Sequence, residues 1–195
     1  MPDKAILFLY EGETEGEFYP PILRDKRGDL RDKGVKIKMK CLGGNFNLNA
    51  KVGDAISSFL SNHKNCYLFV FVALDREGGR DVEPNISPDL IKSKFGKYLK
   101  SIDLIIATQD IESWFFSDID NIYKFLKAPI SKRNPNKYAN FENFNNRHLS
   151  LLFKQFGKCY QKGRRVEGLI NNFDLNKICA KCRDLDEGIK KMQKV

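Results

Sequence analysis

The stretch YLFVFVAL, residues 67–74, runs directly into DREGGR, residues 75–80. A short, continuous apolar run that ends in a glycine-containing turn is typical of a strand buried on both faces of a parallel sheet. The acids in the turn stand where such a strand reaches its carboxyl end. This stretch therefore predicts a parallel sheet that carries acidic side chains at one edge.

Two further apolar runs end in the same way. Residues 5–10 stop at Glu11, and residues 104–107 are followed by Asp110 and Glu112. Each run is short enough for a buried strand and too short for a typical buried helix. The repetition predicts three buried strands, each followed by acids.

The segments between these strands have other periods. Three of them show the apolar spacing of helices: residues 14–23, 52–60 and 87–99. Thr14 and Glu17 have the spacing of a capping box, and two prolines predict an irregular first turn. After a charged loop at residues 24–34, residues 35–41 alternate apolar and basic side chains, which predicts a strand near a sheet edge. The alternation predicts an α/β fold, with a mainly parallel sheet, right-handed crossovers and helices on both faces.

The length of 195 residues fits one buried core with an extension better than two full domains. We expect an α/β domain over residues 1–127 and a loop and helical extension, residues 128–195, packed on it. The loop covers residues 128–147, and helical patterns follow near residues 147–156, 165–173 and 175–193.

The composition narrows the class of protein. Lysine and arginine number 34 against 25 aspartate and glutamate residues, which leaves a net charge of +9 and favours a polyanionic partner. No apolar run approaches the about 20 residues that span a bilayer, so we expect a soluble, cytoplasmic protein that does not contact membranes. The cysteines lack the spacing of a disulfide framework, and Cys179 and Cys182 share an apolar helical stripe that favours core packing over zinc binding.

The acids after the strands predict a metal site. Ligands of parallel α/β sheets bind beyond the carboxyl ends of the strands, where these side chains converge. Asp75 and Glu77 are two positions apart, so both side chains leave an extended backbone on the same face. Together with Glu11, Asp110 and Glu112 they would repel one another unless a cation such as Mg²⁺ or Mn²⁺ lay between them. The alternative is that each acid caps a helix or is a solvated turn residue.

The strings YEGETE at residues 10–15, LDRE at 74–77 and IESWF at 111–115 resemble the TOPRIM signature of topoisomerases, primases and several nucleases. They are more similar to a TOPRIM-like prokaryotic family associated with phage defence, and to the TOPRIM nuclease domain of overcoming-lysogenization-defect proteins. The resemblance covers residues 5–127. It continues more weakly through GKCYQK, residues 157–162, and the helical patterns that follow.

The resemblance implies a role for each matching acid. Glu11 would transfer protons or bind metal, and Glu15 would be an additional ligand one helical turn later. Asp75 and Glu77 would be the paired metal ligands, with a glutamate where the family usually has a second aspartate. Glu112 would complete a second metal site.

Some neighbours of Glu112 leave alternatives open. Asp110 and Asp118 are alternatives to Glu112 as the later acid. Trp114 and Phe115 are expected in the core rather than stacked on bases, because aromatic side chains dominate protein cores.

Phosphoryl chemistry at such a site also needs cationic side chains. Lys158 and Lys162 are the candidate catalytic cations, and Arg76 and Arg80 the candidates for phosphate binding beside the acids. The loop at residues 128–147 mixes cations, amides and aromatics, as loops that hold single-stranded nucleic acid do. Its candidate contacts are Lys132, Arg133 and Lys137. The alternative for every one of these is a solvated surface cation.

These features predict an enzyme, a Mg²⁺- or Mn²⁺-dependent phosphodiesterase that acts on DNA or RNA. The resemblance places it in a prokaryotic defence system against phages or mobile elements, with a partner protein encoded nearby as a further expectation. One alternative is a non-catalytic TOPRIM-shaped module that binds nucleic acid or a partner. Another is an enzyme that acts on small phosphorylated molecules.

Overall fold

The computed structural model describes residues 3–63, 65–76, 82–163 and 166–195, and within these it leaves the side chains of residues 26–29 undescribed. Its centre is a four-stranded sheet in the order β2-β1-β3-β4, and every pair of neighbouring strands is parallel. The strands are β1 (Asp3–Tyr10), β2 (Lys36–Cys41), β3 (Cys66–Asp75) and β4 (Leu99–Ala107). The predicted strands are therefore present, and β2 lies at an edge as its lysines predicted.

The register brings the carboxyl ends of the strands to one edge of the sheet. Tyr10 pairs with Ala73, and Asp75 pairs with Ala107. On the other side of β1, Tyr10 pairs with Cys41. The residues that follow the buried strands consequently start from neighbouring points.

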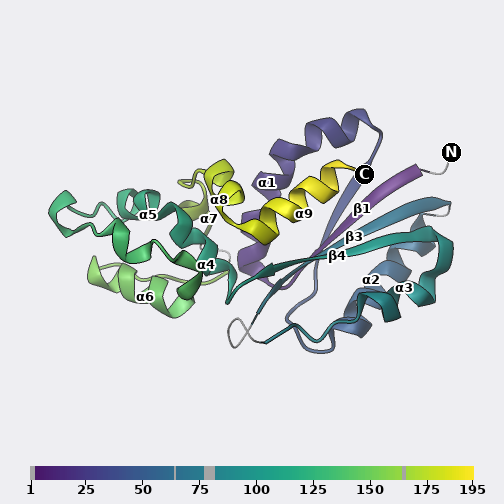
Figure 1. Cartoon of the computed structure of the whole chain (residues 1–195), viewed down its shortest axis with the longest axis horizontal. Coiled ribbons are helices and arrows are strands. Elements are labelled where there is room, and N and C mark those ends of the chain that lie inside the picture. The colour runs from purple at the N-terminus through teal and green to yellow at the C-terminus, as the bar shows by residue number, and fades with distance from the viewer. Residues whose placement is uncertain (1–2, 64, 77–81, 164–165) are drawn as a thin grey trace.

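Helices cover both faces of the sheet (Figure 1). On one face, α2 (Leu48–Asn62) and α3 (Pro88–Phe95) pack on the side chains of β1 and β3 that include Leu7 and Val70. The opposite face, which includes Phe8 and Phe71, is covered by α1 (Glu13–Asp32) and α9 (Arg183–Gln193). This arrangement confirms the predicted α/β class and is consistent with a TOPRIM-like fold.

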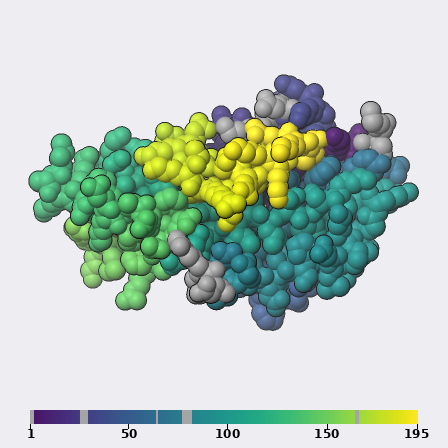
Figure 2. Space-filling view, viewed as in Figure 1, coloured from purple at the N-terminus to yellow at the C-terminus, as the bar shows by residue number. Residues whose placement is uncertain are grey.

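The remaining helices form a group at one end of the molecule (Figure 1). They are α4 (Ile111–Phe115), α5 (Ile119–Phe125), α6 (Asn146–Gln155), α7 (Glu167–Ile170) and α8 (Leu175–Lys181), with short 3-10 turns between them. Their buried side chains belong to the same core as α1 and α9. The C-terminal helices, yellow in Figure 2, lie across the junction between this group and the sheet. Gly188 allows that approach, because a Cβ atom there would lie 2.5 Å from Ile105 of β4.

Two predictions about α1 were wrong. The helix continues through the expected charged loop to Asp32, with Pro20 and Pro21 inside it, because its apolar face, including Leu30, is buried against the sheet. Packing of an amphipathic face outweighs the local effect of proline. The helix also begins at Glu13, so Thr14 lies in its first turn rather than at a capping position.

Other boundaries also differ from the prediction. The continuous helix expected over residues 175–193 is interrupted at Cys182, whose backbone is extended (φ −94°, ψ 99°). Cys182 and Cys179 are both buried in the core, as their apolar stripe predicted. Strand β4 begins five positions before the predicted apolar run, at Leu99. In the described part of the chain, no helix combines the length and the apolar character needed to cross a membrane.

Candidate active site

Glu11 and Asp75 are neighbours at the carboxyl edge of the sheet. Because β1 and β3 are paired, the end of one strand lies beside the end of the other. The backbone amide of Asp75 donates a hydrogen bond of 3.3 Å to Glu11 Oε2. The Asp75 side chain is largely withdrawn from solvent, with only 6% of the residue exposed. The sequence prediction that these two acids meet is confirmed.

Asp110 and Glu112 both follow β4, but their carboxylates have different surroundings. Asp110 is the N-cap of α4: its Oδ1 accepts a hydrogen bond of 3.2 Å from the Ser113 amide, and its Oδ2 accepts one of 2.8 Å from the Asn146 amide. These bonds turn the chain into the helix, whose first turn buries Glu112 completely. Asp110 is thus engaged in holding the backbone, while Glu112 points into the interior.

Lys162 joins Glu112 to Asp75. Its Nζ lies 3.7 Å from Glu112 Oε2 and 4.0 Å from Asp75 Oδ2. The other carboxylate oxygen of Glu112 accepts a hydrogen bond of 2.8 Å from the Tyr160 hydroxyl. The acids of two adjacent strands therefore share one ammonium group, which a distant part of the chain supplies.

A short segment, residues 160–163, delivers Tyr160 and Lys162 to the acids. Its last residue, Gly163, has a left-handed backbone (φ +89°), and its amide donates a buried hydrogen bond of 3.0 Å to Thr14 Oγ1. A Cβ atom at Gly163 would lie only 2.7 Å from Glu13 Oε2. Sequence reasoning missed Tyr160, Gly163 and this role of Thr14, although the string GKCYQK had drawn attention to the segment.

The acids are held in an environment that disfavours their charge. Burial raises the pKa of Asp75 well above its usual value, and the nearby charges of Glu15, Glu11 and Glu112 raise it further, while Lys162 opposes them. Burial, followed by the charge of Asp110, raises the pKa of Glu112 to about 7. A cation near these carboxylates would stabilise their ionised forms.

Glu15 belongs to the same cluster. It is buried in the first turn of α1, and burial raises its pKa although its own amide and the charge of Lys162 act in the opposite direction. A Cβ atom on Gly12 would lie 3.2 Å from Glu15 Oε2, so a small residue at position 12 leaves room for this carboxylate. Lys162 itself has a raised pKa: burial alone would lower it, but Glu112, Asp75 and Glu15 outweigh burial.

Whether these residues suit a divalent metal ion can be tested on their donor atoms. Carboxylate oxygens are the ligands that Mg²⁺ prefers, and Glu112 Oε2 is buried with no hydrogen-bond partner in the described part of the chain. The described residues nevertheless contain no group of three or more His, Cys, Asp or Glu side chains arranged to hold a metal ion. Glu77, the predicted partner of Asp75, lies outside the described residues. The donor chemistry of these carboxylates is therefore of the kind that suits a hard cation, although the described residues alone do not form such a site.

Two other predicted residues lie away from the cluster. Lys158 is exposed, and its Nζ donates to the carbonyl oxygen of Phe125 at 2.9 Å and lies 4.9 Å from the centre of that ring. Asp118 accepts hydrogen bonds from Lys177, Asn121 and the Asp174 amide, so it joins α8 to the turn before α5. Neither residue contacts Asp75 or Glu112 in the structure.

The predicted nucleic-acid contacts are spread over two regions. Arg76 follows Asp75 and pairs with Glu83 at 2.6 Å, whereas Arg80 lies outside the described residues. Of the other three contacts, Lys132 and Lys137 lie in short 3-10 turns of the helical group, and Arg133 directly follows the first of these turns. Lys132 and Lys137 are exposed, and Arg133 is held by two hydrogen bonds to the carbonyl oxygen of Ala128.

The aromatic side chains of residues 128–147 are less available than the sequence indicated. Tyr138 is buried and stacks on Phe116, with ring centres 5.0 Å apart. Phe144 packs on both of these rings. Tyr138 and Phe144 therefore pack in the core of the helical group, where they offer little surface to bases. Trp114 and Phe115 are also buried, as predicted.

Comparisons with known proteins give the chain a family. No curated protein matches it. Among solved structures it is similar to the C-terminal region of the Burkholderia pseudomallei OLD protein, with a TM-score of 0.49 and 16% sequence identity over 97% of this chain and 98% of that one. A family model described as "Domain of unknown function (DUF4276)" matches residues 10–193. Because that match takes in nearly the whole sequence, the chain belongs to the DUF4276 family.

Proposed function

We propose that this protein is a metal-dependent phosphodiesterase that hydrolyses DNA or RNA as part of a prokaryotic defence system. The observation that carries the proposal is the ion-paired cluster at the carboxyl edge of the sheet. Lys162 lies 4.0 Å from Asp75 and 3.7 Å from Glu112, and Glu11 is hydrogen-bonded beside them. The TOPRIM-like strings of the sequence support the same function.

The ligands for Mg²⁺ or Mn²⁺ would come from Glu11, Asp75 and Glu77, with Glu15 and Glu112 as further acids of the site. When bound, the ion would supply an activated water molecule and stabilise charge on the phosphate. Glu11, in this proposal, accepts or returns the proton of the attacking water.

The cationic role falls to Lys162 rather than Lys158. Its ammonium group lies between two acids from neighbouring strands, where it can neutralise charge that develops on a phosphate oxygen. Tyr160 holds Glu112 by its hydroxyl and so acts as a positioning residue. The remaining proposed phosphate contacts are Arg76, Arg80, Lys132, Arg133 and Lys137.

The test uses the full chain with labelled single- and double-stranded DNA and RNA, in Mg²⁺, Mn²⁺ or EDTA. We expect cleavage with either metal and none in EDTA. Lys162→Ala should lower the rate by about 100- to 1,000-fold, the effect of losing one charge-stabilising group, and Lys158→Ala should leave it within about twofold. Asp75→Asn should abolish cleavage. The control is Asp103→Asn, which should not, because Asp103 pairs with Lys191 away from the site.

A non-catalytic module that binds nucleic acid or a partner is the second candidate. The ion pairs of Lys162 favour it, because this ammonium group already offsets the charge of Asp75 and Glu112 without a metal ion. Cleavage that persists in Asp75→Asn would point to a contaminating nuclease. If the pure chain binds nucleic acid but cleaves none of the panel with either metal, the second candidate replaces the first.

A further inference from the structure

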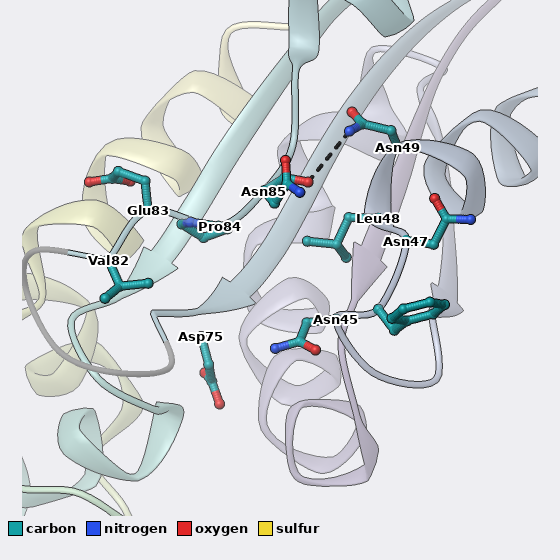
Figure 3. A pocket seen from close by; sticks show the side chains of 10 residues that line it. Asn45, Asn47, Leu48, Asn49, Asp75, Val82, Glu83, Pro84 and Asn85 are labelled. Carbon is teal, nitrogen blue, oxygen red and sulfur yellow. Dashed lines mark hydrogen bonds between the residues drawn. The ribbon is translucent and has the colours of Figure 1, made fainter.

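A hollow of about 540 Å³ adjoins the acid cluster. Its lining comes from the loops that follow two strands: residues 45–49 after β2 and residues 82–85 after β3 (Figure 3). Asp75 also lines it, so the hollow and the cluster share one side chain. Its volume is in the range of pockets that bind small ligands.

An exposed aromatic side chain stands at this hollow. Phe46 is 83% exposed, although burial of a phenylalanine is normally favourable. The loop that carries Phe46 is tied down: the Gly44 amide donates to the Glu11 carbonyl oxygen at 2.9 Å. Lys51 Nζ donates to the carbonyl oxygens of Gly43 and Gly44 at 2.9 and 3.1 Å. The ring is therefore presented on a fixed loop, as a platform for stacking would be.

Amide side chains provide hydrogen-bonding groups around the ring. Asn45, Asn47, Asn49 and Asn85 line the hollow. Asn49 holds the two loops together, since its Oδ1 accepts from the Ser87 amide at 2.8 Å and its Nδ2 donates to the Asn85 carbonyl oxygen at 3.4 Å. Asn47 is exposed at the start of α2 and makes no capping hydrogen bond. Side-chain amides both donate and accept, which suits the polar edge of a base.

The charge of the lining indicates which part of a nucleotide would enter. Asp75 and Glu83 are acidic, and none of the described lining residues is lysine or arginine. Glu83 is paired with Arg76 and Asp75 with Lys162, so the described lining attracts a phosphate group weakly, whereas a neutral, planar group needs no cation. A flat ring with polar edges combines what the phenylalanine and the amides can bind.

We propose that this hollow binds an unpaired nucleobase, adjacent to the phosphate that lies at the acid cluster, with the base stacked on Phe46. The inference rests on the proposed function and adds to it: the substrate is single-stranded nucleic acid, or a strand end with an unpaired base. In a duplex the base is already stacked and paired, and its release would reduce affinity.

The test measures binding by fluorescence anisotropy with Ca²⁺ in place of Mg²⁺. The probes are labelled ten-nucleotide oligothymidylate and oligouridylate, an abasic phosphodeoxyribose chain of the same length, and a duplex. Phe46→Ala should weaken binding of either or both base-containing strands by about 5- to 100-fold and leave the abasic chain and the duplex within about twofold. The strand whose affinity falls more in Phe46→Ala, oligothymidylate or oligouridylate, identifies DNA or RNA as the substrate. Leu151→Ala is the control, because Leu151 is also an exposed apolar residue (57%) but lies on α6 in the helical group.

Phe46→Trp provides a second readout that does not depend on loss of binding. Trp114, the native tryptophan, is buried, so emission from position 46 should be quenched when a base stacks there and unchanged with the abasic chain. The inference is overturned if the parent and Phe46→Ala bind the base-containing strands with equal affinity. It is also overturned if Phe46→Ala loses as much affinity for the abasic chain as for these strands, or if the parent binds none of the strands. Binding that depends on Phe46 without any cleavage removes only the hydrolase proposal. Cleavage with binding that does not depend on Phe46 removes only the base site.

Discussion

The hydroxyl group of Tyr160 donates a hydrogen bond of 2.8 Å to Glu112 Oε1 in the interior of the protein. Tyr160→Phe would remove this bond from a carboxylate whose other oxygen, Oε2, already lacks a hydrogen-bond partner among the described residues. We expect the free energy of unfolding in EDTA to fall by about 1 to 3 kcal/mol, measured by urea denaturation. Tyr98→Phe, which removes a more exposed hydroxyl, should change it by less than about 0.5 kcal/mol.

The same variant separates positioning from simple packing. If Tyr160 holds Glu112 for catalysis, Tyr160→Phe should lower kcat for nucleic-acid cleavage and leave KM nearly unchanged. A loss of stability with unchanged kcat would contradict the positioning role.

Asp75→Asn should melt at a higher temperature than the parent in EDTA. Burial and the charges of Glu15, Glu11 and Glu112 disfavour ionised Asp75, so a neutral side chain should stabilise the fold by about 0.5 to 2 kcal/mol. Added Mg²⁺ should reverse the order, because the ion binds the native parent and the variant lacks a ligand. Thermal melts of both proteins in EDTA and in Mg²⁺ give the comparison.

Asp103→Asn is the control for these melts. Asp103 pairs with Lys191 at 2.9 Å on β4, outside the cluster, so its loss should lower stability by no more than about 1 kcal/mol in either condition. If Asp75→Asn melts lower than the parent in EDTA and Mg²⁺ shifts neither protein, Asp75 is a structural acid.

Gly163→Ala should disturb the site from a distance. Gly163 has a left-handed backbone (φ +89°), and its amide donates a buried hydrogen bond to Thr14 Oγ1 that depends on this conformation. Gly157 has a similar left-handed backbone (φ +68°), and a Cβ atom there would meet nothing within 4 Å. Gly157→Ala is the control. The Gly157 variant should therefore lose about 1 kcal/mol of stability, the backbone effect alone. The Gly163 variant should lose more, because a change of backbone there also weakens the buried hydrogen bond to Thr14, and its cleavage rate should fall because the neighbouring Lys162 is displaced. Equal effects of the two substitutions on stability and rate would show that this hydrogen bond has no consequence for the site.

Asp118→Asn tests a structural carboxylate by its pH dependence. Burial alone would raise the pKa of Asp118, but hydrogen bonds from Lys177, the Asp174 amide and Asn121 outweigh it and lower the pKa. The ionised group therefore stabilises the fold above the unfolded pKa of about 3.9, and this contribution is lost as the pH falls through the lower folded pKa. Asp118→Asn should cost about 2 to 4 kcal/mol at pH 7, and the difference should narrow below about pH 4.

Asp120 offers the matched control for Asp118. It lies 3.8 Å from the same Lys177 but is mostly exposed, so Asp120→Asn should change stability by less than about 1 kcal/mol at any pH in this range. A difference between Asp118→Asn and the parent that stays constant from pH 7 to pH 3 would contradict the assigned role of the ionised carboxyl.

The strands and their acids were predictable because the signal is local. Continuous apolar runs identify buried parallel strands, and parallel pairing alone places Glu11 beside Asp75. The choice between Asp110 and Glu112 was not predictable in this way. It depends on the Asn146 amide and on Lys162, which reach these acids from later parts of the chain.

The parts that sequence reasoning missed depend on contacts between distant residues. Thr14 accepts from Gly163 across 149 positions, and no spacing within either segment indicates that pairing. The extent of α1 was missed for a related reason: proline signals a local break, whereas burial of Leu30 depends on the assembled sheet. Periodicity reports which face of a segment is apolar, and it does not report what covers that face.

The delivery of Lys162 by a late segment affects the protein during its synthesis. The ribosome produces the sheet and the acids Glu11, Asp75 and Glu112 before it produces residues 160–163. Until then, a nascent chain carries the carboxylates without the ammonium group that joins two of them. Under the proposed function, a ribosome-bound chain would lack a complete set of catalytic side chains, so messenger RNA and nearby DNA would not be exposed to cleavage before residues 160–163 have been made.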